Sequence, residues 1–127
     1  MSKGGDIWGI VPVKALAQAK SRLAGVLSQA ERVSLSLQML DRVLSALDES
    51  QYVHQWLLIS RDNRPLDVAR ARMGVALREE VEGLNSSLQQ ATLWAIEHGA
   101  AAILVVPSDL PLITGVEIDA LISCIGG

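Results

Sequence analysis

Residues 101–109 read Ala-Ala-Ile-Leu-Val-Val-Pro-Ser-Asp, and they hold the most apolar run of the chain, followed closely by a carboxylate. The six apolar residues at the start of this stretch predict a β-strand, the most apolar one of the chain. Three earlier apolar runs, at residues 7–13, 53–60 and 75–78, are short enough to be strands as well. Because a helical pattern separates each strand from the next, the order predicts a parallel sheet with right-handed crossovers.

The first two helices are indicated by their ends. Residues 28–31, Ser-Gln-Ala-Glu, match a capping box, and apolar residues at spacings of three and four follow it to about residue 48. Pro65 fits the first turn of a second helix over residues 66–73. Gly74 is the expected terminator of that helix, since glycine readily adopts the left-handed conformation of a helix end.

Two more helices complete the alternation. Asn85 is expected to cap a helix that runs to about His98 and is closed by Gly99. Residues 114–117, Thr-Gly-Val-Glu, match a second capping box and open the last helix. The sequence therefore predicts the order β-α-β-α-β-α-β-α, with helices on both faces of one sheet and a single domain over residues 1–127.

The composition limits the kinds of protein that this chain can be. Half of its 127 residues are apolar, which excludes a disordered chain, and a net charge of −3 argues against a nucleic-acid binder. Cys124 is the only cysteine, so no intrachain disulfide can form and a cytoplasmic location is expected. Neither a secretory signal nor a run of about 20 apolar residues is found, so no membrane association is expected.

Ligands of parallel sheets bind beyond the carboxyl ends of the strands. The loop at residues 14–27 lies there but lacks both the dinucleotide fingerprint and the P-loop pattern. It offers three cations and a hydroxyl, at Lys14, Lys20, Arg22 and Ser21, which suit the negative charge of a triphosphate. The alternative is a solvated loop with ordinary surface charges.

Two other loops lie at the same edge. Asp109 follows the fourth strand between two prolines and can hold Mg²⁺ together with substrate phosphates, or else can form a turn that closes the strand. Residues 83–85, Gly-Leu-Asn, allow close approach of a ligand to the backbone, and the Asn amide can both donate and accept. Taken alone, these three residues are better explained as a glycine turn and a helix cap.

Four motifs together resemble the 2-phospho-L-lactate guanylyltransferase family, which includes members that act on phosphoenolpyruvate. They are Pro-Val-Lys at residues 12–14, Ala-Lys-Ser-Arg-Leu at 19–23, Gly-Leu-Asn at 83–85 and Pro-x-Asp-Leu-Pro-Leu at 107–112. The resemblance extends from about residue 7 to residue 121. It implies a three-layer α/β/α sheet of the nucleotide-diphospho-sugar-transferase type (GT-A, Rossmann-like). The last two motifs would also fit molybdenum-cofactor guanylyltransferases.

The resemblance also implies roles for individual residues. The residues that it assigns to nucleotide binding are Val13, Lys14, Lys20, Ser21, Arg22, Gly83, Leu84 and Asn85. Those that it assigns to catalysis are Lys14, Lys20, Arg22 and Asp109, with Asp109 also holding Mg²⁺ or Mn²⁺. The implied reaction transfers GMP from GTP to a phosphorylated small acid, releases pyrophosphate, and belongs to the biosynthesis of coenzyme F-420.

Members of the family are longer than this chain, and the resemblance places further acidic metal ligands and most of the acid-binding loop beyond residue 127. We therefore expect low catalytic activity from these residues alone, and an uncovered sheet edge beside residues 101–106. A homodimer is the expected assembly. Two alternatives stay open at this stage: a nucleotidyltransferase of the same fold with another acceptor, and a non-catalytic nucleotide-binding or dimerisation module.

Overall fold

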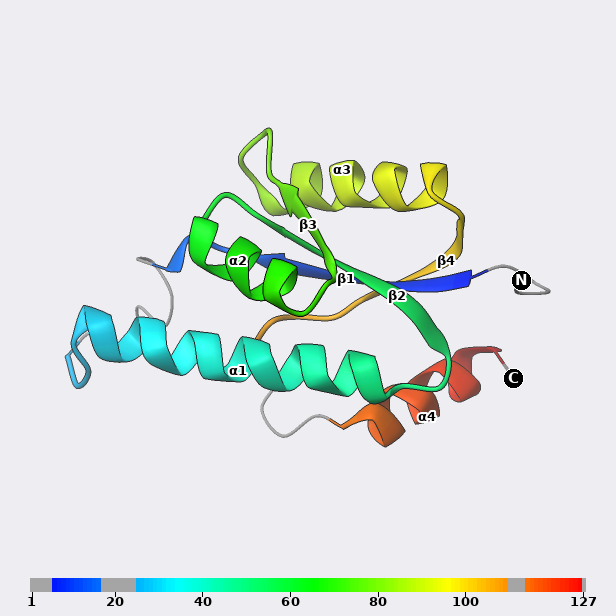
Figure 1. Ribbon diagram of the computed structural model, residues 1–127, viewed down its shortest axis with the longest axis horizontal. Coiled ribbons are helices and arrows are strands. Elements are labelled where there is room, and N and C mark those ends of the chain that lie inside the picture. Colours follow the sequence, from blue (N-terminus) through cyan, green and yellow to red (C-terminus); the bar gives the residue numbers. More distant parts are fainter. Residues whose placement is uncertain (1–5, 17–24, 110–113, 127) are drawn as a thin grey trace.

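The computed structural model describes residues 6–16, 25–109 and 114–126. These residues form strands and helices in strict alternation (Figure 1). In chain order the elements are β1 (Asp6–Val13), α1 (Gln29–Glu49), β2 (Val53–Ser60), α2 (Asn63–Ala71), β3 (Val75–Arg78), α3 (Leu84–Glu97), β4 (Ala100–Val105) and α4 (Gly115–Gly126). The predicted order of elements is confirmed, with the largest boundary shift at α2.

The four strands form one parallel sheet in the order β3-β2-β1-β4. In the register of this sheet, Val13 of β1 lies opposite Ser60 of β2, and Ile10 of β1 lies opposite Val105 of β4. All four carboxyl ends therefore meet at the same edge. The chain places β2 and β3 on one side of β1 and β4 on the other, and ligands of such sheets commonly bind where the strand order reverses.

Helices cover both faces of the sheet, as Figure 1 shows for α1 and α3. Alternate residues of each strand point to opposite faces, so that Val11 and Leu58 pack on the side of α1, α2 and α4. Ile10 and Ile59 pack on the other side, against α3. The three-layer α/β/α architecture is thereby confirmed, and its core consists of aliphatic residues with two buried tryptophans, Trp8 and Trp56.

Both predicted capping boxes are present. Glu31 N donates to Ser28 Oγ at 3.1 Å, while Ser28 N donates to Glu31 Oε1 at 2.8 Å. Thr114 and Glu117 make the same reciprocal pair at the start of α4, at 3.2 and 3.1 Å. Among the described residues, no helix has both the length and the hydropathy that a membrane span requires.

The predicted end of α2 is wrong in one respect. Met73, not Gly74, has the left-handed backbone, with φ 62°. The amides of Met73 and Gly74 donate to the carbonyls of Arg70 and Ala69, at 3.0 and 2.9 Å, which is the hydrogen-bond pattern of a Schellman motif. Glycine is required at position 74 for a different reason, since a Cβ atom there would overlap the ring of Trp56.

The predicted cap of α3 is also wrong. Gly83 is the N-cap residue, with φ 120° and no side-chain cap, and Asn85 lies inside the first helical turn. Side chains from the first turns of the helix bind the end of β3 and the residues that follow it. Gln90 Oε1 accepts a hydrogen bond from the amide of Glu80, and Gln90 Nε2 donates to the carbonyl of Arg78. Ser87 Oγ donates to Glu79 Oε1 at 2.6 Å.

Candidate active site

Two of the predicted site residues follow the carboxyl ends of adjacent strands, at the same edge of the sheet. Lys14 and Asp109 each lie four residues after a member of the opposed pair Ile10 and Val105. The amide of Val106 continues this pairing, donating to the carbonyl of Ile10 at 2.8 Å. Both Lys14 and Asp109 are exposed. The end of β1 and the end of β4 can thus offer a cation and a carboxylate to one ligand.

The remaining residues of the first loop divide into two groups. Lys20, Ser21 and Arg22 lie outside the described residues, so their predicted contacts with phosphate stay predictions. Val13 is described, and its side chain is buried in the core under α1. Only the backbone of Val13 can therefore contact a nucleotide.

The third predicted segment, residues 83–85, lies at the same edge but at its far end, after β3. Gly83 has open space around the position of a Cβ atom, and the side chains of Leu84 and Asn85 are exposed. Neighbouring strands lie about 4.8 Å apart, so three spacings place the ends of β3 and β4 about 14 Å apart. A ligand that contacts both Asn85 and Asp109 must therefore extend across the ends of β2 and β1.

A fourth segment lies on that path, and the sequence interpretation passed over it. It follows β2 and reads Ser-Arg-Asp-Asn-Arg at residues 60–64. The signal was available, since polar residues directly follow an apolar strand there as they do after β1 and β4. The short connection between β2 and α2 made it look like an ordinary turn.

Asp62 is the centre of this fourth segment. Its Oδ2 accepts the backbone amide of Leu16 at 2.8 Å and Arg64 Nη2 at 3.0 Å. Its Oδ1 accepts the backbone amide and Nε of Arg64, at 3.0 and 3.2 Å. The carboxylate therefore caps α2 and at the same time joins α2 to the chain that leaves β1.

These contacts change the acidity of Asp62. Burial by itself raises the pKa of this carboxyl group, since the Asp62 side chain is only 11% exposed. The hydrogen bonds from Arg64 and from the Leu16 amide outweigh burial and lower the pKa from 3.8 to about 2. Asp62 is thus a fixed negative charge at every pH of biological interest.

Ion pairs surround the ends of β2 and β3. Arg61 lies 3.6 Å from Glu79 and 3.5 Å from Glu82. Arg78 donates to the carbonyl of Arg61 and to the side chain of Asn63. Because the Arg61 side chain is 44% exposed, its pairs with Glu79 and Glu82 contribute little to stability.

The described residues suit a metal ion that is shared with substrate phosphates, and not one that is held by protein side chains alone. Among the described residues, no three His, Cys, Asp or Glu side chains are grouped to form a protein-only metal site. Asp109 instead fits the pattern in which Mg²⁺ is held by one or two carboxylates and by the phosphates of its substrate.

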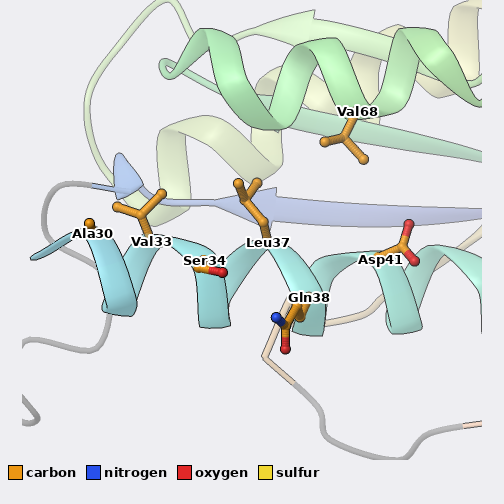
Figure 2. Close-up of a pocket in the computed structure, with 7 residues that line it drawn as sticks. All are labelled: Ala30, Val33, Ser34, Leu37, Gln38, Asp41 and Val68. Carbon is orange, nitrogen blue, oxygen red and sulfur yellow. The ribbon is translucent and has the colours of Figure 1, made fainter. Parts of the chain in front are cut away.

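One groove of the described surface lies away from this edge. It has a volume of about 450 Å³ and lies between α1 and α2 (Figure 2). Val33 and Leu37 of α1 face Val68 of α2 across it. None of the predicted site residues lines this groove, and most of its lining is apolar. It is therefore a poor candidate for a polyanion site.

The sheet and its helices define a class by fold, the α/β proteins with the fold of nucleotide-diphospho-sugar transferases. A solved structure from Desulfovibrio desulfuricans G20, described as a nucleotide-diphospho-sugar transferase, superposes with a TM-score of 0.75. The match covers 94% of this chain and 54% of that one, at 15% sequence identity. At that identity the similarity establishes the fold alone.

The sequence narrows the class to a family. Residues 7–126 match the family described as "Guanylyl transferase CofC like", and the chain belongs to this family. It is 41% identical over 121 residues to the phosphoenolpyruvate guanylyltransferase of Rubrobacter xylanophilus, covering 95% of this chain and 58% of that protein. It is 33% identical over 114 residues to the 2-phospho-L-lactate guanylyltransferase of Methanocaldococcus jannaschii, covering 89% of this chain and 48% of that one. The chain thus spans about half the length of these relatives.

Proposed function

We propose that this chain is the nucleotide-binding part of a guanylyltransferase that transfers GMP from GTP to a phosphorylated small acid. The observation that carries the proposal is the family match over residues 7–126, which includes the loops after β1, β3 and β4. The arrangement of Lys14 and Asp109 at the ends of adjacent parallel strands supports it.

In the proposed reaction the protein forms no covalent bond with either substrate. A phosphate oxygen of the acid attacks the α-phosphorus of GTP, the bond to the β-phosphate oxygen breaks, and pyrophosphate leaves. Because the attacking oxygen is already ionised at pH 7, no general base is needed. The protein must bring two polyanions together in line and offset their charge, by analogy with phosphoryl transfer.

In this proposal each segment of the edge has its own task. Lys14, with Lys20, Ser21 and Arg22, binds the phosphates of GTP, and residues 83–85 contact the nucleoside. Asp109 holds Mg²⁺ or Mn²⁺, which supplies Lewis-acid stabilisation of phosphate charge when bound. Asp109 itself orients that charge relative to the end of β4.

Phosphoenolpyruvate is the first acid to test, because the Rubrobacter relative is named for it. 2-Phospho-L-lactate is the second, after the name of the Methanocaldococcus relative. Either acid would place the enzyme in coenzyme F-420 biosynthesis, in the cytoplasm. The comparisons do not favour a molybdenum-cofactor acceptor. The two relatives are named for phosphoenolpyruvate and 2-phospho-L-lactate, and the family description names no acceptor.

The test is calorimetric titration of GTP with Mg²⁺ into the wild-type chain and into two variants, K14A and the double variant K20A/R22A. Loss of charge-assisted phosphate contacts is expected to weaken binding by about 2–4 kcal/mol in the double variant. Arg42→Ala is the matched control, because Arg42 is an exposed cation on α1 away from the edge. Equal GTP affinity in all variants, or none in the wild type, would count against the proposal.

Pyrophosphate release with each acid then tests the transfer step. A D109N variant is expected to lose the dependence of GTP affinity on Mg²⁺ while it keeps the weaker affinity seen in EDTA. If wild type and D109N respond to Mg²⁺ alike, the metal is held elsewhere.

A further inference from the structure

The segment that follows β1 is held at two points, and only two residues separate them. Val13 is paired with Ser60 in the sheet and is buried. Leu16 is fixed twice, since its side chain is 2% exposed in the core and its amide donates to Asp62 Oδ2 at 2.8 Å. Lys14 and Ala15 are all that lies between these points, so the backbone of Lys14 has little freedom.

Asp62, the second of these points, is itself held rigidly. Its amide donates to Ser60 Oγ at 3.1 Å, and Ser60 is completely buried at the end of β2. Arg64 binds both carboxylate oxygens of Asp62, which fixes the orientation of the carboxylate. A rigid acceptor thus ties the chain after β1 to the end of the neighbouring strand.

We infer that Asp62 is a positioning residue for nucleotide binding: by holding the Leu16 amide, it directs Lys14 toward the phosphates of the ligand. The inference rests on the proposed function, because it assigns Asp62 an effect on the same phosphate site. Asp62 lies too close to Arg64 and to Leu16 to be a phosphate ligand itself, and its own negative charge would repel one.

Asp62 uses both carboxylate oxygens as acceptors, whereas capping a helix requires only one acceptor oxygen. Asparagine caps a helix about as well as aspartate, so D62N keeps the cap of α2. Its side chain, however, has one acceptor oxygen where Asp62 uses two, and its NH₂ group cannot accept from Leu16 or Arg64. The substitution therefore weakens the contact with the Leu16 amide while it keeps a capping side chain at the start of α2.

The experiment compares the wild-type chain with D62N by amide hydrogen exchange and by titration with GTP, GDP and guanosine in the presence of Mg²⁺. Exchange of the Leu16 amide is expected to become at least tenfold faster in D62N, since its acceptor is weakened. GTP affinity is expected to fall about tenfold or more, and guanosine affinity to stay the same, because Lys14 acts on phosphate. Asp67→Asn is the control, as Asp67 is an exposed carboxylate on the same helix and pairs with Arg70 within that helix.

Four outcomes decide the matter. A loss confined to the phosphorylated ligands, with D67N unchanged, supports the inference. An equal loss for guanosine and GTP would mean that D62N damages the fold in general, and unaltered GTP binding by D62N would mean that Lys14 needs no such support. Either of these two results overturns the inference and leaves the proposed function standing. A wild-type chain that binds none of the three ligands overturns the proposed function and the inference with it.

Discussion

At the scale of single residues, position 74 shows how a structural requirement can differ from the one that the sequence indicates. A Cβ atom at Gly74 would lie 2.6 Å from Cζ2 of Trp56 and closer still to neighbouring ring atoms. The ring cannot move away freely, because Trp56 is 3% exposed and its Nε1 donates to Asp48 Oδ1 at 2.7 Å. Gly74→Ala is therefore expected to lower the free energy of unfolding by about 1–3 kcal/mol, measured by urea denaturation.

Gly25→Ala is the matched control for that prediction. A Cβ atom at position 25 meets nothing within 4 Å, and the backbone there is not left-handed. Restricting the unfolded chain at such a site is expected to be neutral or to stabilise the protein by about 0.4–1 kcal/mol. If both alanine variants are as stable as the wild type, the contact between Gly74 and Trp56 is looser than the structure indicates.

Asp62 also makes stability depend on pH. Its pKa falls from 3.8 in the unfolded chain to about 2 in the folded protein, so its ionised form is bound more tightly by the folded state. This contribution of about 2 kcal/mol is complete well above pH 4 and is lost as the pH falls through 2. The difference in unfolding free energy between wild type and D62N should therefore shrink between pH 5 and pH 2. A difference that stays constant over that range would show that the charge of Asp62 is not what stabilises the fold.

At the scale of elements, the sequence predicted which segments are helices and strands because their patterns are local. The capping boxes at residues 28–31 and 114–117 satisfy backbone amides within one turn, so they can be identified without the rest of the fold. The start of α3 could not be identified in this way. The first turns of α3 bind Glu79 and Glu80, which follow β3, through Ser87 and Gln90, and those contacts exist only once the loop has closed.

The packing of α4 on α1 gives a prediction at this scale. A Cβ atom at Gly115 would lie 2.6 Å from Glu49 Cβ and 2.8 Å from the Glu49 carbonyl carbon, which is backbone and cannot rotate away. Gly115→Ala should therefore push α4 outward and weaken the bond from Ser50 Oγ to Asp119 Oδ1, now 2.5 Å. We expect a loss of about 1–3 kcal/mol in the free energy of unfolding, even though alanine favours a helix over glycine.

Val116→Ala is the control for α4. Val116 occupies the same helical turn but is 78% exposed, so its truncation should change the free energy of unfolding by no more than about 0.5 kcal/mol. If the two variants are equally stable, α4 is not held against α1 by the contact at Gly115.

At the scale of the whole molecule, the sequence predicted the common edge of the sheet better than the contacts along it. The alternation of strands and helices implies one common edge, and that edge was enough to bring Lys14 and Asp109 to adjacent strands. The role of Asp62 could not be predicted, because its contact with Leu16 joins residues 46 positions apart. Such a contact follows from the register of β1 against β2, which no short motif encodes.

Among the described residues, the outer edge of β4 is the unpaired strand edge that best fits association with a second copy of this chain. Both outer strands of the sheet have an edge that no described strand pairs, but β3 has only four residues and ends in Arg78. β4 has six residues, none of them charged, and Val105 is 45% exposed. Because short or charged edges resist association while long apolar edges favour it, we expect two copies of this chain to pair along β4.

Sedimentation equilibrium over a range of protein concentrations measures this association directly. Wild type is expected to be a dimer, and V105K a monomer, since a lysine on the edge must lose its hydration when another strand approaches. Met73→Lys is the control, because Met73 is 91% exposed and lies before β3, at the opposite side of the sheet. If V105K is still a dimer, the two copies associate through another surface. If wild type is a monomer at every concentration, the expected pairing along the β4 edge is wrong.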